Sequence, residues 1–227
     1  MTGVQTLVCR SAVVNPPMIG NAWADSIELE GAGQHRRAYE HFQSCPEIPE
    51  LDRADVLFHM DWCLEVDHGD MEVALAHYLE AAGLALNPPL MANANYRAAL
   101  LAFDARRLPQ AIALMEKTCA IVASHAALQD LDKHAAYWLG ISYEADGRIL
   151  DAVELYDAVG ESAKPRVGAE AWYRQMLGLV SIGAFDAALR VASQLIGADD
   201  GGDEGIAHLA DLAARERNQV LLAWGDA

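Results

Sequence analysis

The sequence is poor in basic residues and in long hydrophobic runs, and each shortage excludes a class of partner. Sixteen Lys and Arg stand against 33 Asp and Glu, which gives a formal net charge of −17. Nucleic acid and anionic membrane surfaces are held mainly by cationic side chains, so neither is an expected partner. The chain also contains no apolar run of the roughly 18 residues that would indicate a membrane-spanning helix. We therefore expect a protein that binds neither nucleic acid nor membrane.

Cysteines are few and unpaired in sequence. Cys9, Cys45, Cys63 and Cys119 are widely scattered and form no CxxC pair, which predicts reduced thiols rather than a disulfide framework or a zinc site. Residues 1–17 lack the basic start and long apolar stretch of a secretory signal. A cytoplasmic location follows, with no cofactor and no metal.

Motifs for catalysis are also lacking. There is no glycine-rich phosphate loop, no HExxH, no GxSxG and no kinase set. His59, His68 and His77 are nine residues apart, whereas two ligands on one helix face require a spacing of three or four. We interpret them as scattered histidines and do not expect an enzyme.

What the sequence does contain is apolar residues of the helical kind. Hydrophobic residues make up 53% of the chain but aromatic residues only 7%, and most of the remainder is Ala, Leu and Val, which suits closely packed helices. The composition predicts an all-α protein with a buried core.

An internal repeat organises this helical pattern. Residues 136–159 read AYWLGISYEADGRILDAVELYDAV, an apolar helix, a break at Asp146-Gly147 and a second amphipathic helix. The same shape recurs around Gly33, Gly69 and Gly183, and more weakly around Arg106, which stands where the glycine is expected. A small residue follows each break by five positions, with spacings of 36, 37, 41 and 36 residues between successive copies; these are Ala38, Ala74, Ala111, Ala152 and Ala188.

The repeat resembles the tetratricopeptide repeat (TPR) family. The similarity is strongest in Ala169-Glu170-Ala171-Trp172-Tyr173 and in a set of packing positions of the unit at Gly147, namely Leu139, Gly140, Tyr143, Gly147, Ala152 and Tyr156. It implies an all-α fold, a right-handed α-α superhelix (TPR-like solenoid) of about five helix pairs. The close-approach position of Gly140 holds Trp62 and Met176 in two other units, which predicts wider packing there.

Three segments follow from this pattern. Residues 1–19 form an N-terminal segment, residues 20–198 the repeat domain, and residues 199–227 a loop and a helix that begins at Glu204. A solenoid leaves its last apolar face open, so we interpret this helix as a cap. Its proposed apolar face comprises Ile206, Leu209, Leu212, Ala213, Val220 and Leu221.

The resemblance also implies a concave binding surface lined by the first helix of each pair. Its groove-facing position holds only aromatic rings or imidazole: Trp23, His59, Tyr96, Tyr137 and Tyr173. Further along the same helices stand four carboxylates: Glu30, Asp67, Asp104 and Glu144. This aromatic and acidic pairing predicts a groove for a peptide with basic and apolar side chains. The alternative is that the aromatics pack between helices and the acids are an ordinary solvated face.

One function of the family is excluded by sequence. TPR domains that clamp a partner's C-terminal carboxylate carry Asn at a position occupied here by Ile27, Cys63, Leu100, Ile141 and Leu177. Arg97 and Arg174 are isolated candidates for such a clamp.

The sequence therefore favours a protein-interaction module, a scaffold, adaptor or chaperone-like protein. Two alternatives stay open. One is a small enzyme or metal-binding protein that uses the histidines near Asp61 and Asp67, and the other is a structural subunit that forms homo-oligomers through Leu221, Leu222 and Trp224.

Overall fold

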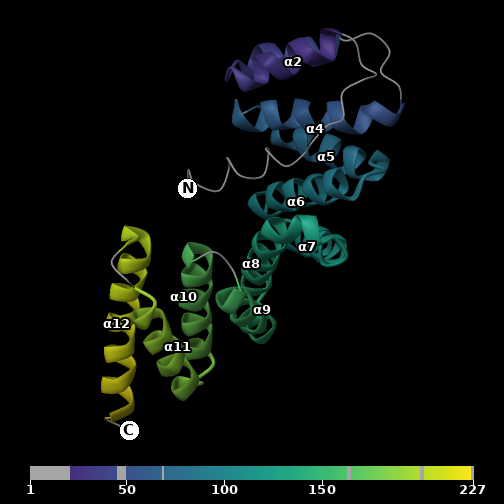
Figure 1. The fold of residues 1–227 in the computed structure, drawn as a ribbon. Helices are drawn as coiled ribbons and strands as arrows, with labels where there is room; N and C mark the ends of the chain where they lie inside the picture. Colours follow the sequence, from purple (N-terminus) through teal and green to yellow (C-terminus); the bar gives the residue numbers. More distant parts are fainter. Residues whose placement is uncertain (1–20, 45–49, 68, 163–164, 200–201, 226–227) are drawn as a thin grey trace. The chain divides into compact units, whose positions relative to one another are not determined.

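The structure is a computed structural model that describes residues 21–44, 50–67, 69–162, 165–199 and 202–225. The predicted N-terminal segment, residues 1–19, and His68 lie outside these ranges. Figure 1 shows that the regular elements of the described ranges are helices. They are α2 (Asn21–Gly31), α3 (His35–Ser44), α4 (Glu50–Val66), α5 (Met71–Leu84), α6 (Pro88–Asp104), α7 (Leu108–Ala123), the short 3₁₀ helix η1 (Ala126–Leu128), α8 (Gln129–Ala145), α9 (Ile149–Ser162), α10 (Pro165–Ser181), α11 (Phe185–Gly197) and α12 (Glu204–Gly225).

The helices follow the predicted repeat. Helices α2 and α3, α4 and α5, α6 and α7, and α10 and α11 pack as consecutive pairs, and α9 packs against α10. The remaining pair, the fourth along the chain, is α8 and α9, joined at the break predicted at Asp146-Gly147. The prediction of an all-α repeat built from helix pairs is thus confirmed.

The repeat alanines sit where each second helix begins. All five are at most 1% exposed. In each case the backbone N–H donates to the carbonyl four residues earlier, as Ala111 does to Arg107 and Ala152 does to Arg148. Because each of these alanines is buried, a side chain larger than a methyl group has no room at its position, which explains why Ala recurs there.

The turn inside four of the pairs needs a left-handed residue. Gly33, Gly147 and Gly183 have φ between 75° and 81°, and Arg106 has φ of 61°. The next residue's N–H closes the end of the first helix, as Arg107 N–H does on the Ala102 carbonyl. Arg106 therefore occupies the conformation expected of the missing glycine, so the weakest copy of the repeat keeps its backbone geometry.

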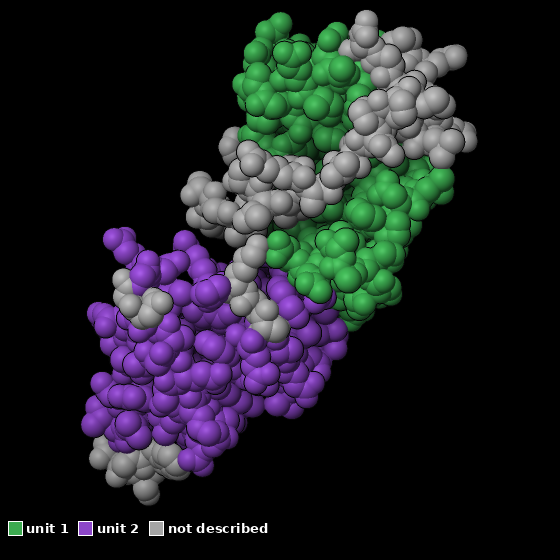
Figure 2. Space-filling view, in the orientation of Figure 1, with its two compact units in different colours: residues 1–131 green, residues 132–227 purple. Residues whose placement is uncertain are grey.

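The chain divides into two compact units, residues 1–131 and 132–227, coloured separately in Figure 2. The division falls in the first turn of α8, inside the predicted repeat domain. Each unit has its own core, with Leu75 and Tyr78 central in unit 1 and Met176 and Leu195 in unit 2. Within unit 2, a Cβ added at Gly140 would lie 2.6 Å from the Tyr156 ring, which is the close approach expected of that glycine.

Helix α12 covers the last pair. It packs against α10 and α11, and Ile206, Ala213 and Val220 of its predicted apolar face are buried. Leu221, included in that face, is instead exposed, as is Leu222, which is 71% exposed. The buried part of the apolar face therefore ends at Val220, one residue earlier than the sequence pattern predicted.

Candidate functional site

The first helices turn one side to the core and leave another side outside it. On α6, Leu90, Ala94, Ala98 and Leu101 belong to the core cluster shared with α4 and α5. Leu100, Phe103 and Asp104 lie at helical spacings on another side. We define two surfaces from the predicted residues. The unit 1 face comprises Trp23, Glu30, His59, Asp67, Tyr96 and Asp104, and the unit 2 face comprises Tyr137, Glu144 and Tyr173.

Two aromatic members of the unit 1 face lie inside the protein. Trp23 is 5% exposed and Tyr96 is fully buried. The Trp23 ring packs at 5.5 Å from Phe42 and at 5.3 Å from His59, measured between ring centroids. Burial raises the pKa of the Tyr96 hydroxyl. A partner does not reach these two rings in this conformation, so they act as packing residues, as the alternative interpretation of the aromatic positions states.

Glu30 and His59 pair with each other. The His59 Nδ1 lies 2.8 Å from Glu30 Oε2, and both side chains are largely covered. The pair joins α2 to α4. Within it, the Glu30 carboxylate, which was predicted to contact a partner, is bound to His59. Its role in this structure is to hold two neighbouring first helices together.

Asp67 and Asp104 remain as exposed carboxylates of the unit 1 face. Within the described ranges neither has an ion-pair partner. Partial burial, followed by the charge of Glu65, raises the pKa of Asp104, while Arg106 opposes this effect. Half-buried Val66, Leu100 and Phe103 lie next to them in sequence or one turn away. These residues place negative charge beside apolar side chains, which differ from the aromatic residues that the sequence pattern paired with the acids.

The unit 2 face is internally neutralised. Arg174 donates through Nη1 to Glu144 at 3.1 Å and through Nε to the Tyr137 hydroxyl at 3.2 Å. The Tyr156 hydroxyl donates to the same Glu144 oxygen at 2.8 Å. Tyr173 is half-buried, and burial and then the charge of Glu216 on α12 raise its pKa. Arg174, isolated in sequence, is thus engaged within its own unit.

A second polar network lies in unit 1 and was missed by the search for motifs. Arg97 donates through Nε to Glu65 at 3.0 Å and forms an ion pair with it, and its guanidinium lies 4.9 Å from the centre of the Trp62 ring. The Tyr78 hydroxyl also donates to Glu65. Burial alone would lower the pKa of Arg97, but Glu65 raises it above its ordinary value. Arg97 is thereby engaged within unit 1, in the same way as Arg174 in unit 2.

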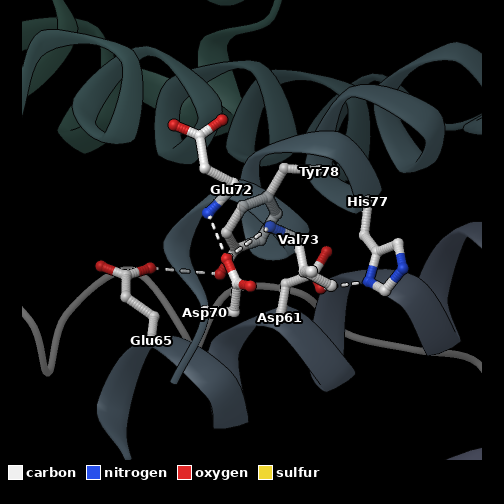
Figure 3. A network of polar contacts seen from close by, with 7 residues as sticks. All are labelled: Asp61, Glu65, Asp70, Glu72, Val73, His77 and Tyr78. Atoms are coloured by element: carbon white, nitrogen blue, oxygen red, sulfur yellow. Dashed lines mark hydrogen bonds and ion pairs between the residues drawn. The ribbon is translucent and has the colours of Figure 1, made fainter. Parts of the chain in front are cut away.

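The same region holds the pair Asp61 and His77. The His77 Nδ1 lies 2.8 Å from Asp61 Oδ1, between α4 and α5, and Figure 3 draws this pair together with the Glu65–Tyr78 contact and the cap at Asp70. Asp70 caps α5 by accepting from the N–H groups of Glu72 and Val73. The sequence had grouped the histidines with Asp61 only for the alternative of a small enzyme or metal-binding protein, and their separation of 16 residues gave no signal of this contact. Comparison of equivalent repeat positions would have shown a carboxyl where Leu139 stands in another unit.

A metal site and a membrane-spanning helix are both absent from the part of the chain that the structure describes. There, no group of three or more His, Cys, Asp or Glu side chains gathers to hold a metal ion. No helix among the described residues combines the length and the apolar character needed to cross a bilayer.

Comparison with known proteins identifies the fold. No protein-family model matches the sequence, and no curated protein matches it. Solved structures do. The MamA protein (residues 41 to end) of Desulfovibrio magneticus RS-1 aligns with a TM-score of 0.66 at 16% identity, over 82% of this chain and 99% of that one. YrrB, described as a TPR protein with an unusual peptide-binding site, aligns with a TM-score of 0.65 at 13% identity, over 82% and 89%.

A third match is to nearly identical TPR-like repeats of a kinesin light chain from Podosopora anserina, with a TM-score of 0.63 at 14% identity, over 81% and 95% of the two chains. The protein has the TPR fold. Its five TPR-type pairs keep the small residue at the start of each second helix and the left-handed turn in four of them, although identities are too low to transfer function. The TPR fold positions the two first-helix faces defined above.

Proposed function

We propose that this TPR protein is a non-enzymatic interaction module, a scaffold, adaptor or chaperone-like protein of the cytoplasm. It binds a polypeptide segment with basic and apolar side chains along its first helices. Asp67 and Asp104 of the unit 1 face contribute the contact to a basic side chain, and Val66, Leu100 and Phe103 contribute the apolar contact. The peptide-binding site described for YrrB supports a polypeptide as the class of partner.

The observation that carries this proposal is the exposure of Asp67 and Asp104 without an ion-pair partner in the described ranges. The other charged groups of the predicted site are engaged, Glu30 with His59 and Glu144 with Arg174. A carboxylate that is partly desolvated and unpaired gains most from an incoming cation, because part of its desolvation cost is already incurred in the free protein.

A display experiment tests the proposal. Random peptides are selected on the purified protein, and we expect enrichment of sequences in which Lys or Arg alternates with Leu, Phe or Met. The double variant Asp67→Lys with Asp104→Lys is expected to lose these peptides by a factor of about 10 or more, because each reversal replaces an attraction by a repulsion.

The control is Glu154→Lys, an exposed carboxylate on second helix α9 that changes the net charge in the same direction. It is expected to keep the selected peptides, with circular dichroism showing that both proteins fold. Equal binding by the double variant and the wild type would refute the assignment of the unit 1 face.

Exposed Leu221 and Leu222 favour a second candidate function, self-assembly through the end of α12. Trp224, the third residue of that prediction, lies outside the described side chains. Sizing chromatography of Leu222→Glu tests it. A concentration-dependent oligomer in the wild type that is absent in the variant supports assembly, and a monomer in both excludes it.

A further inference from the structure

One buried carboxyl of unit 1 has no charge partner that fits it. Asp61 on α4 is fully buried. Its Oδ1 faces the Nδ1 of His77, while its Oδ2 has no hydrogen-bond partner among the described residues. Buried carboxylates are normally satisfied at both oxygens, so this arrangement is costly for the ionised form.

The cations nearby are committed to other carboxylates. Arg97 of α6 binds Glu65, and Arg53 binds Glu80 of α5. On α3, which also packs against α4, Arg36 pairs with Glu40, Arg37 donates to Gln34, and His41 contacts Ser26. Tyr78 of α5 donates to Glu65. Asp61 is thus surrounded by Glu65 and Glu80, with His77 as the one titratable partner in direct contact among the described side chains.

The repeat shows that this carboxyl is not required by the fold. The equivalent position holds Leu139 in the fourth pair and Ala98 in the third. Asp25 occupies it in the first pair, where the side chain is exposed. An aliphatic residue would fill the site of Asp61 without an unpaired oxygen, so the carboxyl costs stability that the TPR packing does not demand.

We propose that the buried carboxyl of Asp61, beside His77, is a proton-binding site that makes the packing of α4 on α5 depend on pH. The Asp61 carboxyl takes up one proton from solvent, and the His77 ring that contacts its Oδ1 is partly exposed. With that proton bound, the buried site carries no net negative charge. Loss of the proton leaves a carboxylate in an apolar interface beside two further carboxylates, and α4 separates more easily from α5.

The direction of the pH dependence follows from the protonation of Asp61. Burial, then the charges of Glu65 and Glu80, raise the pKa of Asp61 from 3.8 to about 9. The folded protein therefore holds a proton that the unfolded chain releases near pH 4. The stabilisation from this proton is complete below pH 4 and is lost as the pH rises towards 9.

The proton site also bears on binding. Helix α4 carries His59, and Asp67 follows directly after its last residue, so looser packing of α4 would change the unit 1 face. This consequence rests on the proposed function, whereas the proton site itself does not, because stability is measured without a partner.

Chemical denaturation between pH 5 and 8 tests the proposal. The folding equilibrium constant of the wild type is expected to fall with rising pH by up to about tenfold per pH unit relative to Asp61→Asn, whose amide does not titrate. The matched control Asp25→Asn, at the same repeat position but exposed, should parallel the wild type. If Asp61→Asn fails to fold, Asp61→Leu, with the residue found at position 139, replaces it.

Two further measurements separate this site from its neighbours. Infrared spectra at pH 7 should contain a protonated carboxylic acid band that disappears in Asp61→Asn. His77→Gln should keep the pH dependence, because the carboxyl stays buried. Parallel stability profiles of wild type and Asp61→Asn, absence of the acid band, or a pH dependence lost only in His77→Gln would each overturn the proposal.

Discussion

Arg106 shows how a single residue can depart from a repeat while the backbone does not. Its φ of 61° matches the glycines at the other turns, and its N–H donates to the Phe103 carbonyl, as the Gly147 N–H does to Glu144. A side chain with a Cβ is strained in this region because the Cβ approaches the carbonyl oxygen. The surrounding hydrogen bonds impose the conformation in spite of that cost.

Replacing Arg106 by Gly is therefore expected to stabilise the protein. Relief of the left-handed strain should raise the free energy of unfolding by about 1 kcal/mol, reduced in part by the greater entropy of glycine in the unfolded chain. The unfolding transition of unit 1 in urea measures this change in the free energy of unfolding. Gly147→Ala, the reverse change at the equivalent turn, should destabilise by a similar amount, and a loss of stability in Arg106→Gly would contradict the account.

Most carboxylates in and around the predicted site are paired with another side chain. Glu30, Glu65 and Glu144 each receive a hydrogen bond or ion pair from another helix of the same unit. Of these three carboxylates, Glu30 and Glu65 are largely covered and Glu144 is more exposed, so pairing offsets the desolvation cost mainly at the first two. Asp104, the last residue of α6, and Asp67, which follows α4, are the acids of the predicted site without an ion pair among the described residues.

At the scale of elements, α12 illustrates how a solenoid is terminated. The last pair exposes Leu179, Val191 and Leu195 towards the end of the array unless another helix covers them, and these residues share a core with Ile206 and Ala213 of α12. The Asp203 side chain accepts from the N–H groups of Gly205 and Ile206 and so caps the start of α12.

Ala213→Asp is expected to release this helix. The fully buried methyl group would be replaced by a carboxyl with no partner, which costs about 3 kcal/mol in the free energy of unfolding. Hydrogen exchange should show faster exchange in α10, α11 and α12. His208→Asp, on the exposed side of the same helix, should leave exchange unchanged, and equal protection in both variants would argue against the capping role.

At the scale of the whole molecule, the net charge of −17 shapes the binding equilibrium. An acidic protein attracts a cationic peptide over about a Debye length, so association depends on ionic strength. The apolar part of the contact does not share this dependence.

Binding of a peptide selected on the protein is expected to weaken on the order of tenfold between roughly 0.05 and 0.5 M salt. Fluorescence anisotropy with a labelled peptide measures the change. The double variant Asp67→Lys with Asp104→Lys should show a smaller slope against salt than Glu154→Lys. An affinity that does not respond to salt would indicate a purely apolar partner and exclude the electrostatic part of the proposal.

The repeat was predictable from sequence because its determinants are local. The spacing of Ala38, Ala74, Ala111, Ala152 and Ala188, the break residues and the apolar periodicity each act within a few turns of helix. They were sufficient for the helix pairs, for the turn at Arg106 and for the helix that begins at Glu204.

The state of the site was decided by tertiary structure. Sequence placed Trp23 and Tyr96 among the binding residues, whereas packing against neighbouring helices buries them. Sequence reasoning treated Arg97 and Arg174 as isolated. In the structure Arg97 pairs with Glu65 and Arg174 with Glu144, each from a position about 30 residues away. Burial and long-range pairing depend on which helix lies alongside, and this is not encoded by local spacing. The sequence by itself therefore determined the helices and their order, and the packing of those helices decided which of their charges stay available.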